Sequence, residues 1–208
     1  MNGSKEQLFS ELADEAANCM RCPAMCGRSA VLSTLNGSPR ARIMFIGEAP
    51  GRKGADRTRV PFSGDQSGAN LDRFLGSIGL KREQIFITSA ALCNPRTDSG
   101  ANRKPTLREL ANCSDFLRRT IELIDPRVIV TLGSVALEAL KRIQYHELSL
   151  KESAAGIHSW QDRVLVPIYH PSPQVLASHR REAEQLRDYQ VVAQAVYGQF
   201  HERSESNR

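Results

Sequence analysis

The sequence lacks any long apolar run, which excludes a membrane-spanning helix. Such a helix needs about 18 consecutive apolar residues, and no stretch of these 208 residues approaches that length. The N-terminus also lacks the apolar segment of a secretory signal. Aromatic residues make up only 6% of the chain, but 40% of the residues are hydrophobic and 25% are charged, a balance typical of globular proteins. We expect a soluble, cytoplasmic protein without membrane contact.

The chain also lacks internal repeats, low-complexity tracts and a recognisable linker. Its length suits one domain of ordinary size and is short for two. We therefore expect a single domain over residues 1–208, and a monomer.

Lysine is scarce, and arginine supplies most of the positive charge. The 28 basic residues are 22 Arg and 6 Lys, and against 23 acidic residues they leave a net charge of +5. Because the guanidinium group binds phosphate in a bidentate manner, this bias suits an anionic partner.

Cysteine is sparse and odd in number, at five residues. Without an export signal, this count favours metal binding or chemistry over a disulfide scaffold. Cys19 and Cys22 have CxxC spacing, and Cys93 and Cys113 follow later. By spacing alone, these four thiols can hold one zinc ion or one iron–sulfur cluster, although Cys93 and Cys113 also suit small buried side chains. Cys26 is surplus to either site.

Four short apolar runs alternate with helical patterns, which is typical of an α/β protein with a parallel sheet. Ser4 and Thr106 are the expected N-caps of two helices, and Glu109 completes a capping box with Thr106. Gly79 marks the end of another helix. We expect a three-layer α/β/α sandwich with a short, mainly parallel four-stranded central sheet. The expected strands cover 43–46, 85–88, 128–131 and 164–168, and the expected helices cover 4–18, 71–78, 106–123, 134–142 and 180–198.

Special sequences follow the ends of these strands, where α/β sheets bind ligands. Residues 47–51 read GEAPG, 87–93 read ITSAALC, and 170–172 read HPS. The segments 54–68 and 102–113 add an RT…FSGD pattern and an NRKPT…C pattern. In this order and with the four cysteines, the motifs resemble those of the iron–sulfur uracil-DNA glycosylases, families 4 and 5.

The resemblance implies an enzyme of base-excision repair. Such an enzyme flips uracil out of DNA and hydrolyses its N-glycosidic bond, leaving an abasic site, and it cleaves no strand itself. Hypoxanthine and other deaminated bases are further expected substrates. The resemblance also implies a 4Fe–4S cluster on Cys19, Cys22, Cys93 and Cys113, in place of zinc.

Three catalytic roles follow from the resemblance. His170 is expected to stabilise the departing base. Asp65 is the first candidate to position the attacking water, and Glu48 is the alternative. Phe62 is expected to stack under the flipped base. The remaining base-binding residues are Gly47, Ala49, Pro50, Gly51 and Ser89.

Basic residues near these motifs are expected to hold the DNA backbone. Leu176, or its neighbour Val175, is the expected wedge in the duplex. The predicted DNA-binding residues are Arg52, Arg57, Arg59, Arg96, Arg103, Ser172 and Leu176.

Ser89 departs from the family pattern, which has Asn at this position to read the edge of uracil. A serine hydroxyl supplies only part of that hydrogen bonding. Two alternatives therefore stay open. One is a non-catalytic or weakly active module that binds damaged DNA, and the other is a zinc-stabilised protein that acts on a nucleotide or another phosphate.

Overall fold

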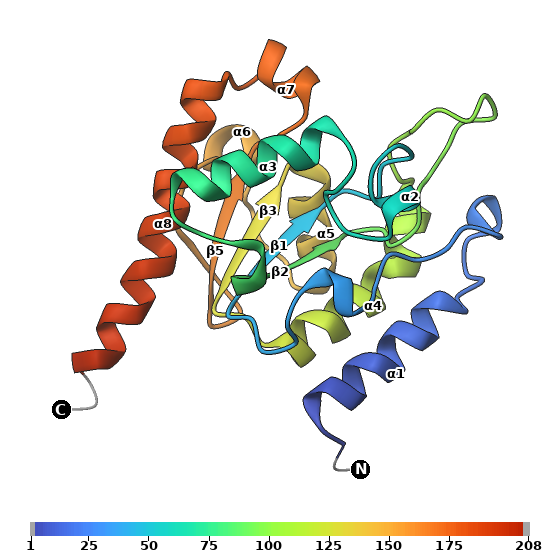
Figure 1. Cartoon of the computed structure of the whole chain (residues 1–208), viewed down its shortest axis with the longest axis horizontal. Helices are drawn as coiled ribbons and strands as arrows, with labels where there is room; N and C mark the ends of the chain where they lie inside the picture. The colour runs from blue at the N-terminus through green and yellow to red at the C-terminus, as the bar shows by residue number, and fades with distance from the viewer. Residues whose placement is uncertain (1–2, 206–208) are drawn as a thin grey trace.

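The protein is a five-stranded sheet between two helical layers (Figure 1). The computed structural model describes the backbone of residues 3–205 and the side chains of residues 3–198. The strand order is β2-β1-β3-β5-β4. The parallel strands are β1 (Ile43–Gly47), β2 (Ile85–Ser89), β3 (Val128–Leu132) and β5 (Arg163–Ile168).

The fifth strand corrects the predicted count of four. β4 (His158–Trp160) pairs antiparallel with β5 at the edge of the sheet. It is three residues long and begins with two polar residues, so it has no apolar run to reveal it. The turn that joins it to β5 places Gln161 and Asp162 at positive φ, 48° and 55°, which is the geometry of a two-residue hairpin but without its usual Asn-Gly signature.

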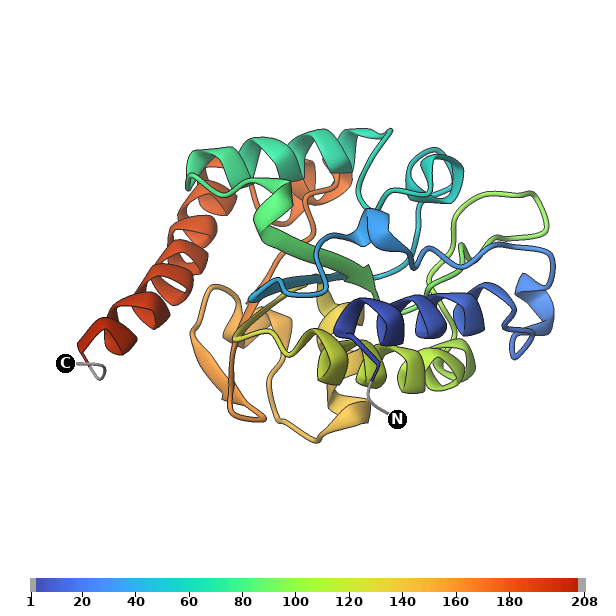
Figure 2. The ribbon, with the colours of Figure 1, turned by 60° about the horizontal axis from the view of Figure 1, so that its bottom comes forward.

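Helices cover both faces of the sheet, which confirms the predicted sandwich (Figure 2). The first layer holds α1 (Lys5–Ala17), α4 (Leu107–Ile124) and α5 (Ser134–Ile143), which share a buried apolar cluster with Phe86 and Leu165. The second layer holds α3 (Gln66–Ser77) and α8 (Glu182–Glu205), which pack on Phe45 and Val130. The shorter helices are α2 (Ala55–Thr58), α6 (Leu150–Ser153), α7 (Pro173–Ser178), η1 (Pro23–Met25), η2 (Thr34–Asn36) and η3 (Arg82–Gln84).

The helix ends follow the predicted capping chemistry. Ser4 accepts a hydrogen bond from the backbone of Gln7 at the start of α1. Thr106 and Glu109 form the predicted capping box of α4. Gly79 has φ 71° just beyond α3, a conformation that glycine adopts without strain. In residues 3–205, no helix is both long and apolar enough to cross a membrane.

Candidate active site

A cavity of about 650 Å³ lies at the carboxyl ends of the parallel strands. Loops after β1, β2, β3 and β5 form it, as expected for a sheet of this kind. The structure therefore brings most of the predicted site together. The predicted residues that line the cavity are Glu48, Ala49, Pro50, Gly51, Arg52, Phe62, Asp65, Ser89, Arg103, His170 and Ser172.

The Phe62 ring lies between the end of β1 and the His170 ring. The two ring centroids are 5.4 Å apart, and the planes are tilted by 36°. Gly47 also lies against the Phe62 ring, since a Cβ atom on Gly47 would be 2.7 Å from Phe62 Cε2. The same Cβ position is 3.7 Å from Ser89 Oγ. Gly47 therefore allows an aromatic surface and a hydroxyl to meet at one end of the cavity.

The His170 imidazole is neutral in this environment. Burial lowers its pKa from 6.5 to about 4, and the charge of Asp65 only partly opposes this shift. Two amide side chains fix the loop around it. Gln185 of α8 donates to the His170 carbonyl (3.2 Å), and Asn70 of α3 donates to the Pro171 carbonyl (2.8 Å). A neutral ring on a rigid loop can donate one N–H group to a ligand at a fixed position.

The two candidate carboxylates have different surroundings. Asp65 is the N-cap of α3, and its Oδ1 accepts from the Gly68 backbone N–H (3.0 Å). Its Oδ2 packs so closely that a Cβ on Gly54 would be 2.3 Å away. In the described part of the chain, the Glu48 carboxylate has no hydrogen-bond partner, and burial raises the pKa of this carboxyl although Lys104 opposes the shift. Glu48 is therefore the carboxylate that remains available to a ligand or water.

Asn94 is a site residue that sequence reasoning missed. Its side chain is 1% exposed, and its Nδ2 donates to the Pro50 carbonyl (2.6 Å) and to Asn102 Oδ1 (3.0 Å). Asn102 Oδ1 also accepts from the Arg52 backbone N–H (3.0 Å). These bonds tie the GEAPG loop to the loop after β2. The sequence shows only that a polar residue directly follows Cys93. Without the fold, this position alone is weak evidence for a role in the site.

Four of the predicted DNA-binding arginines, Arg57, Arg59, Arg96 and Arg103, have hydrogen-bond partners within the protein. Arg96 pairs with Asp56 and donates to Asn94 Oδ1. Arg103 forms a two-pronged ion pair with Glu109 (2.7 and 2.6 Å), which lowers the pKa of the Glu109 carboxyl to about 2. These guanidinium groups brace the long loop after β2.

Arg59 binds the backbone of the segment that follows Cys26. Its guanidinium donates to the carbonyls of Ser29 (3.1 Å), Ala30 and Asp56 (3.4 Å). The side chains of Arg52 and Arg57 are exposed. Arg57 Nε donates to the Lys53 carbonyl (3.2 Å).

The predicted wedge lies on α7, beside the cavity. Val175 lines the cavity. Leu176 is partly buried and packs on the apolar cluster of α3 and α8. The side chain that faces the cavity is therefore Val175.

The four predicted metal-binding thiols lie near one another. Burial raises the pKa of Cys93 to about 12 and that of Cys113 to about 11, and the charges of Cys19 and Cys22 contribute to both shifts. Cys26 is exposed, and its Sγ is 3.6 Å from the Cys22 carbonyl. Among the described residues, no three such side chains are arranged to hold a single metal ion. Thiolates are the usual ligands of an iron–sulfur cluster, so Cys19, Cys22, Cys93 and Cys113 are its candidate ligands, and binding would remove the protons that burial retains.

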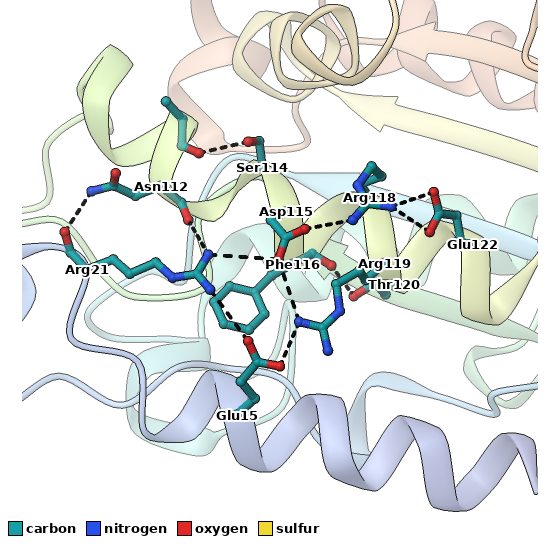
Figure 3. Close-up of polar contacts among 11 residues, drawn as sticks. Glu15, Arg21, Asn112, Ser114, Asp115, Phe116, Arg118, Arg119, Thr120 and Glu122 are labelled. Atoms are coloured by element: carbon teal, nitrogen blue, oxygen red, sulfur yellow. Dashed lines mark hydrogen bonds and ion pairs between the residues drawn. The ribbon is translucent and has the colours of Figure 1, made fainter. Parts of the chain in front are cut away.

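A polar network joins Arg21, which lies between the first two cysteines in the sequence, to Glu15 of α1 and Asn112 of α4 (Figure 3). Asn112 donates to the Arg21 carbonyl (2.7 Å) and to Cys22 Sγ (3.3 Å). The Arg21 guanidinium lies 4.8 Å from the centre of the Phe116 ring and pairs with Glu15 at 3.5 Å. The CxxC loop is thereby held against α4, the helix that carries Cys113.

Comparisons with known proteins identify one family and several relatives that cover most of this chain. The family model of the uracil DNA glycosylase superfamily matches residues 35–191. The Type-4 uracil-DNA glycosylase of Thermotoga maritima is 32% identical over 81% of this chain and 84% of that protein. The Type-4 enzyme of Saccharolobus solfataricus is 36% identical over 77% of this chain and 74% of that protein. The Type-5 enzyme of Thermus thermophilus is 38% identical over 78% of each.

Proposed function

Because the chain belongs to the uracil-DNA glycosylase superfamily, we propose that it hydrolyses the N-glycosidic bond of uracil in DNA and leaves an abasic site. Hypoxanthine and other deaminated bases are further substrates, because Ser89 restricts the base less than an Asn side chain does. The observation that carries the proposal is the cavity in which Phe62, His170 and Glu48 meet.

The base enters the cavity after leaving the DNA stack. Phe62 offers it a face, and His170 donates its N–H group to a carbonyl oxygen of the base. As the N-glycosidic bond breaks, negative charge grows on the base and positive charge grows on the sugar. A fixed donor stabilises the growing negative charge without rearrangement. A neutral His170 is suited to this role, because it carries no charge that must be removed between turnovers.

Glu48 is the carboxylate that positions the attacking water in this proposal. Asp65, the first candidate from the sequence, uses one oxygen to cap α3 and has the other packed against Gly54. Glu48 has both oxygens available among the described residues and lines the cavity. A carboxylate there also screens the positive charge on the sugar.

Cys19, Cys22, Cys93 and Cys113 would hold a 4Fe–4S cluster. The group would supply cross-links between the N-terminal segment, the loop after β2 and α4, and hydrolysis needs no electron from it.

A duplex oligonucleotide with one uracil tests the proposed function. The labelled strand is incubated with the protein, and half of each sample is then heated in alkali. We expect cleavage at the uracil only after alkali, because the protein removes the base and does not cut the strand. Parallel duplexes carry hypoxanthine or xanthine and define the base preference.

A matched duplex with thymine is the control. If no deaminated base is excised by protein that carries its cluster, the proposal is wrong. Tight binding of the uracil duplex in the same preparation would then support the non-catalytic alternative.

A further inference from the structure

We propose that Arg82 is a positioning residue that holds Phe62 in the orientation needed to stack under the base. This inference rests on the proposed function for its kinetic consequence. Arg82 lies in η3 and does not line the cavity. It would act on the reaction through the backbone of Phe62.

Phe62 has an unfavourable backbone conformation. Its φ is 50°, in the left-handed region that residues other than glycine rarely adopt. A bulky residue keeps such a conformation only where its surroundings enforce it, and these positions are common at functional sites. Phe62 therefore needs contacts that hold its backbone in this conformation.

Arg82 supplies the main polar contacts of this turn. One terminal guanidinium nitrogen donates to the Pro61 carbonyl (2.8 Å), and the other donates to the Phe62 carbonyl. The remaining Nε donates to Asp72 Oδ1 of α3 (2.5 Å). The planar guanidinium group thus joins two successive carbonyls to a helix of the core. Removal of Arg82 would leave both carbonyls without these donors.

The carbonyl group and the aromatic ring of Phe62 are both closely packed. On the carbonyl side, a Cβ on Gly68 would be 2.2 Å from Phe62 O. On the ring side, both Gly47 and His170 contact the aromatic group. Rotation of the backbone at Phe62 therefore moves the ring out of the cavity. This geometry links the Arg82 donors to the stacking surface.

A direct phosphate contact is the competing role for Arg82. Its charge is already paired with Asp72, and its two terminal nitrogens point at backbone carbonyls. Only 28% of its side chain is exposed. These contacts favour the positioning role.

A double-mutant cycle tests the proposal. Single-turnover excision of uracil is measured for the wild type, Arg82→Ala, Phe62→Ala and the double variant, with enzyme in saturating excess. We expect Arg82→Ala to slow excision about tenfold, because small displacements of a positioning group have effects of this order or larger. In the Phe62→Ala background the same change should slow excision by less than about twofold, because no ring remains to be positioned.

Two further variants separate this role from loss of charge. Arg82→Lys keeps the charge but offers no planar fork, so we expect an intermediate rate. Arg73→Ala removes a half-exposed arginine that pairs with Glu182 (2.6 Å), and we expect it to excise at the wild-type rate. Hydrogen exchange should become faster in peptides covering residues 60–64 of Arg82→Ala, with little change elsewhere.

Equal slowing by Arg82→Ala in both backgrounds would overturn the proposal, as would a wild-type rate in Arg82→Ala. If Arg82→Ala does not fold, the cycle is run with Arg82→Lys and the same criteria apply. If the wild-type protein excises no base, the proposed function fails. The hydrogen-exchange comparison then decides whether Arg82 holds the loop.

Discussion

At the scale of single residues, the cavity sets protonation states that the sequence does not reveal. His170 follows a strand in an HPS motif, and the sequence marks it as a candidate. Only the surrounding side chains show that burial lowers its pKa to about 4. Burial also raises the pKa of Glu48. The same desolvation therefore keeps one group neutral and makes the other harder to ionise, because both charged forms lose water.

His170→Ala should impair turnover more than DNA affinity. The imidazole donates to a charge that grows only as the bond breaks, so its loss should reduce the single-turnover rate by roughly a hundredfold while the Kd for a uracil duplex changes little. Rates and Kd are measured on the same duplex. Equal losses in both quantities would contradict the leaving-group role.

The same variant should change the pH dependence of stability. Folded His170 titrates near pH 4 and the unfolded residue near 6.5, so the unfolded state binds more protons between these values. Wild-type stability should fall as pH drops from 6.5 towards 4. In His170→Ala this part of the decrease should be absent from urea-unfolding curves.

Glu48→Gln and Asp65→Asn should separate the two carboxylates. If Glu48 positions the water, Glu48→Gln should slow excision by about 10² to 10⁴-fold at nearly unchanged thermal stability. Its loss should also remove the acidic limb of the pH–rate profile, which lies above the ordinary Glu pKa of 4.5 because burial raises that value. Asp65→Asn should excise at close to the wild-type rate, because the Asn side chain can still accept the Gly68 hydrogen bond that caps α3. Slow excision by Asp65→Asn together with a wild-type rate for Glu48→Gln would show instead that Asp65 positions the water.

At the scale of elements, the segment between α1 and β1 has little regular structure of its own. It contains the CxxC pair and two short 3-10 helices, η1 and η2. Its attachment comes from other elements, through Asn112 of α4 and through Arg59 beside α2. A segment with few helical or sheet hydrogen bonds depends on such contacts for its order.

Arg59→Gln and Arg57→Gln should therefore have different effects. Arg59→Gln removes donors to the Ser29 and Ala30 carbonyls, so we expect faster loss of the iron–sulfur absorbance near about 400 nm in the presence of a chelator. Arg57→Gln should keep the wild-type rate of cluster loss and weaken DNA binding. Equal cluster loss in the two variants would contradict this division between structural and DNA-binding arginines.

At the scale of the whole molecule, the arginines that give the chain its net charge of +5 differ in what they contact. Arg59, Arg96 and Arg103 bind groups within the protein, although the sequence assigned them to DNA. Arg52 and Arg57 keep exposed side chains near the cavity. Arg52 and Arg57 are therefore the predicted DNA-binding arginines that we expect to contribute most to DNA affinity.

Salt dependence of DNA binding should reflect this smaller set. Arg52→Gln and Arg57→Gln should each reduce the slope of log K against log salt concentration by about 1, the change expected for one lost phosphate contact. The slope is measured by anisotropy with a labelled duplex from low to physiological salt. Arg118→Gln, which removes an exposed charge on α4 paired with Asp115 and Glu122, should leave the slope unchanged.

The sequence by itself determined the class of the fold and the place of the site. Apolar runs and capping residues such as Thr106 specify buried strands and helix starts locally, and the carboxyl ends of parallel strands must share one edge of a sheet. The motifs at those ends therefore had to meet. The sequence did not predict β4, because three residues with two polar side chains carry no local pattern. The pairing of β4 with β5 comes from the hairpin that joins them.

Only the tertiary structure decided which partner each polar group has. The sequence ranks Asp65 ahead of Glu48 as the carboxylate that positions the water, and it does not distinguish Arg57 from Arg59. Their different roles arise because hydrogen bonds and burial depend on residues distant along the chain, such as Ser29 for Arg59 and Arg82 for Phe62. A periodic pattern can report which face of an element is buried. It carries no information on which carbonyl a buried guanidinium will bind.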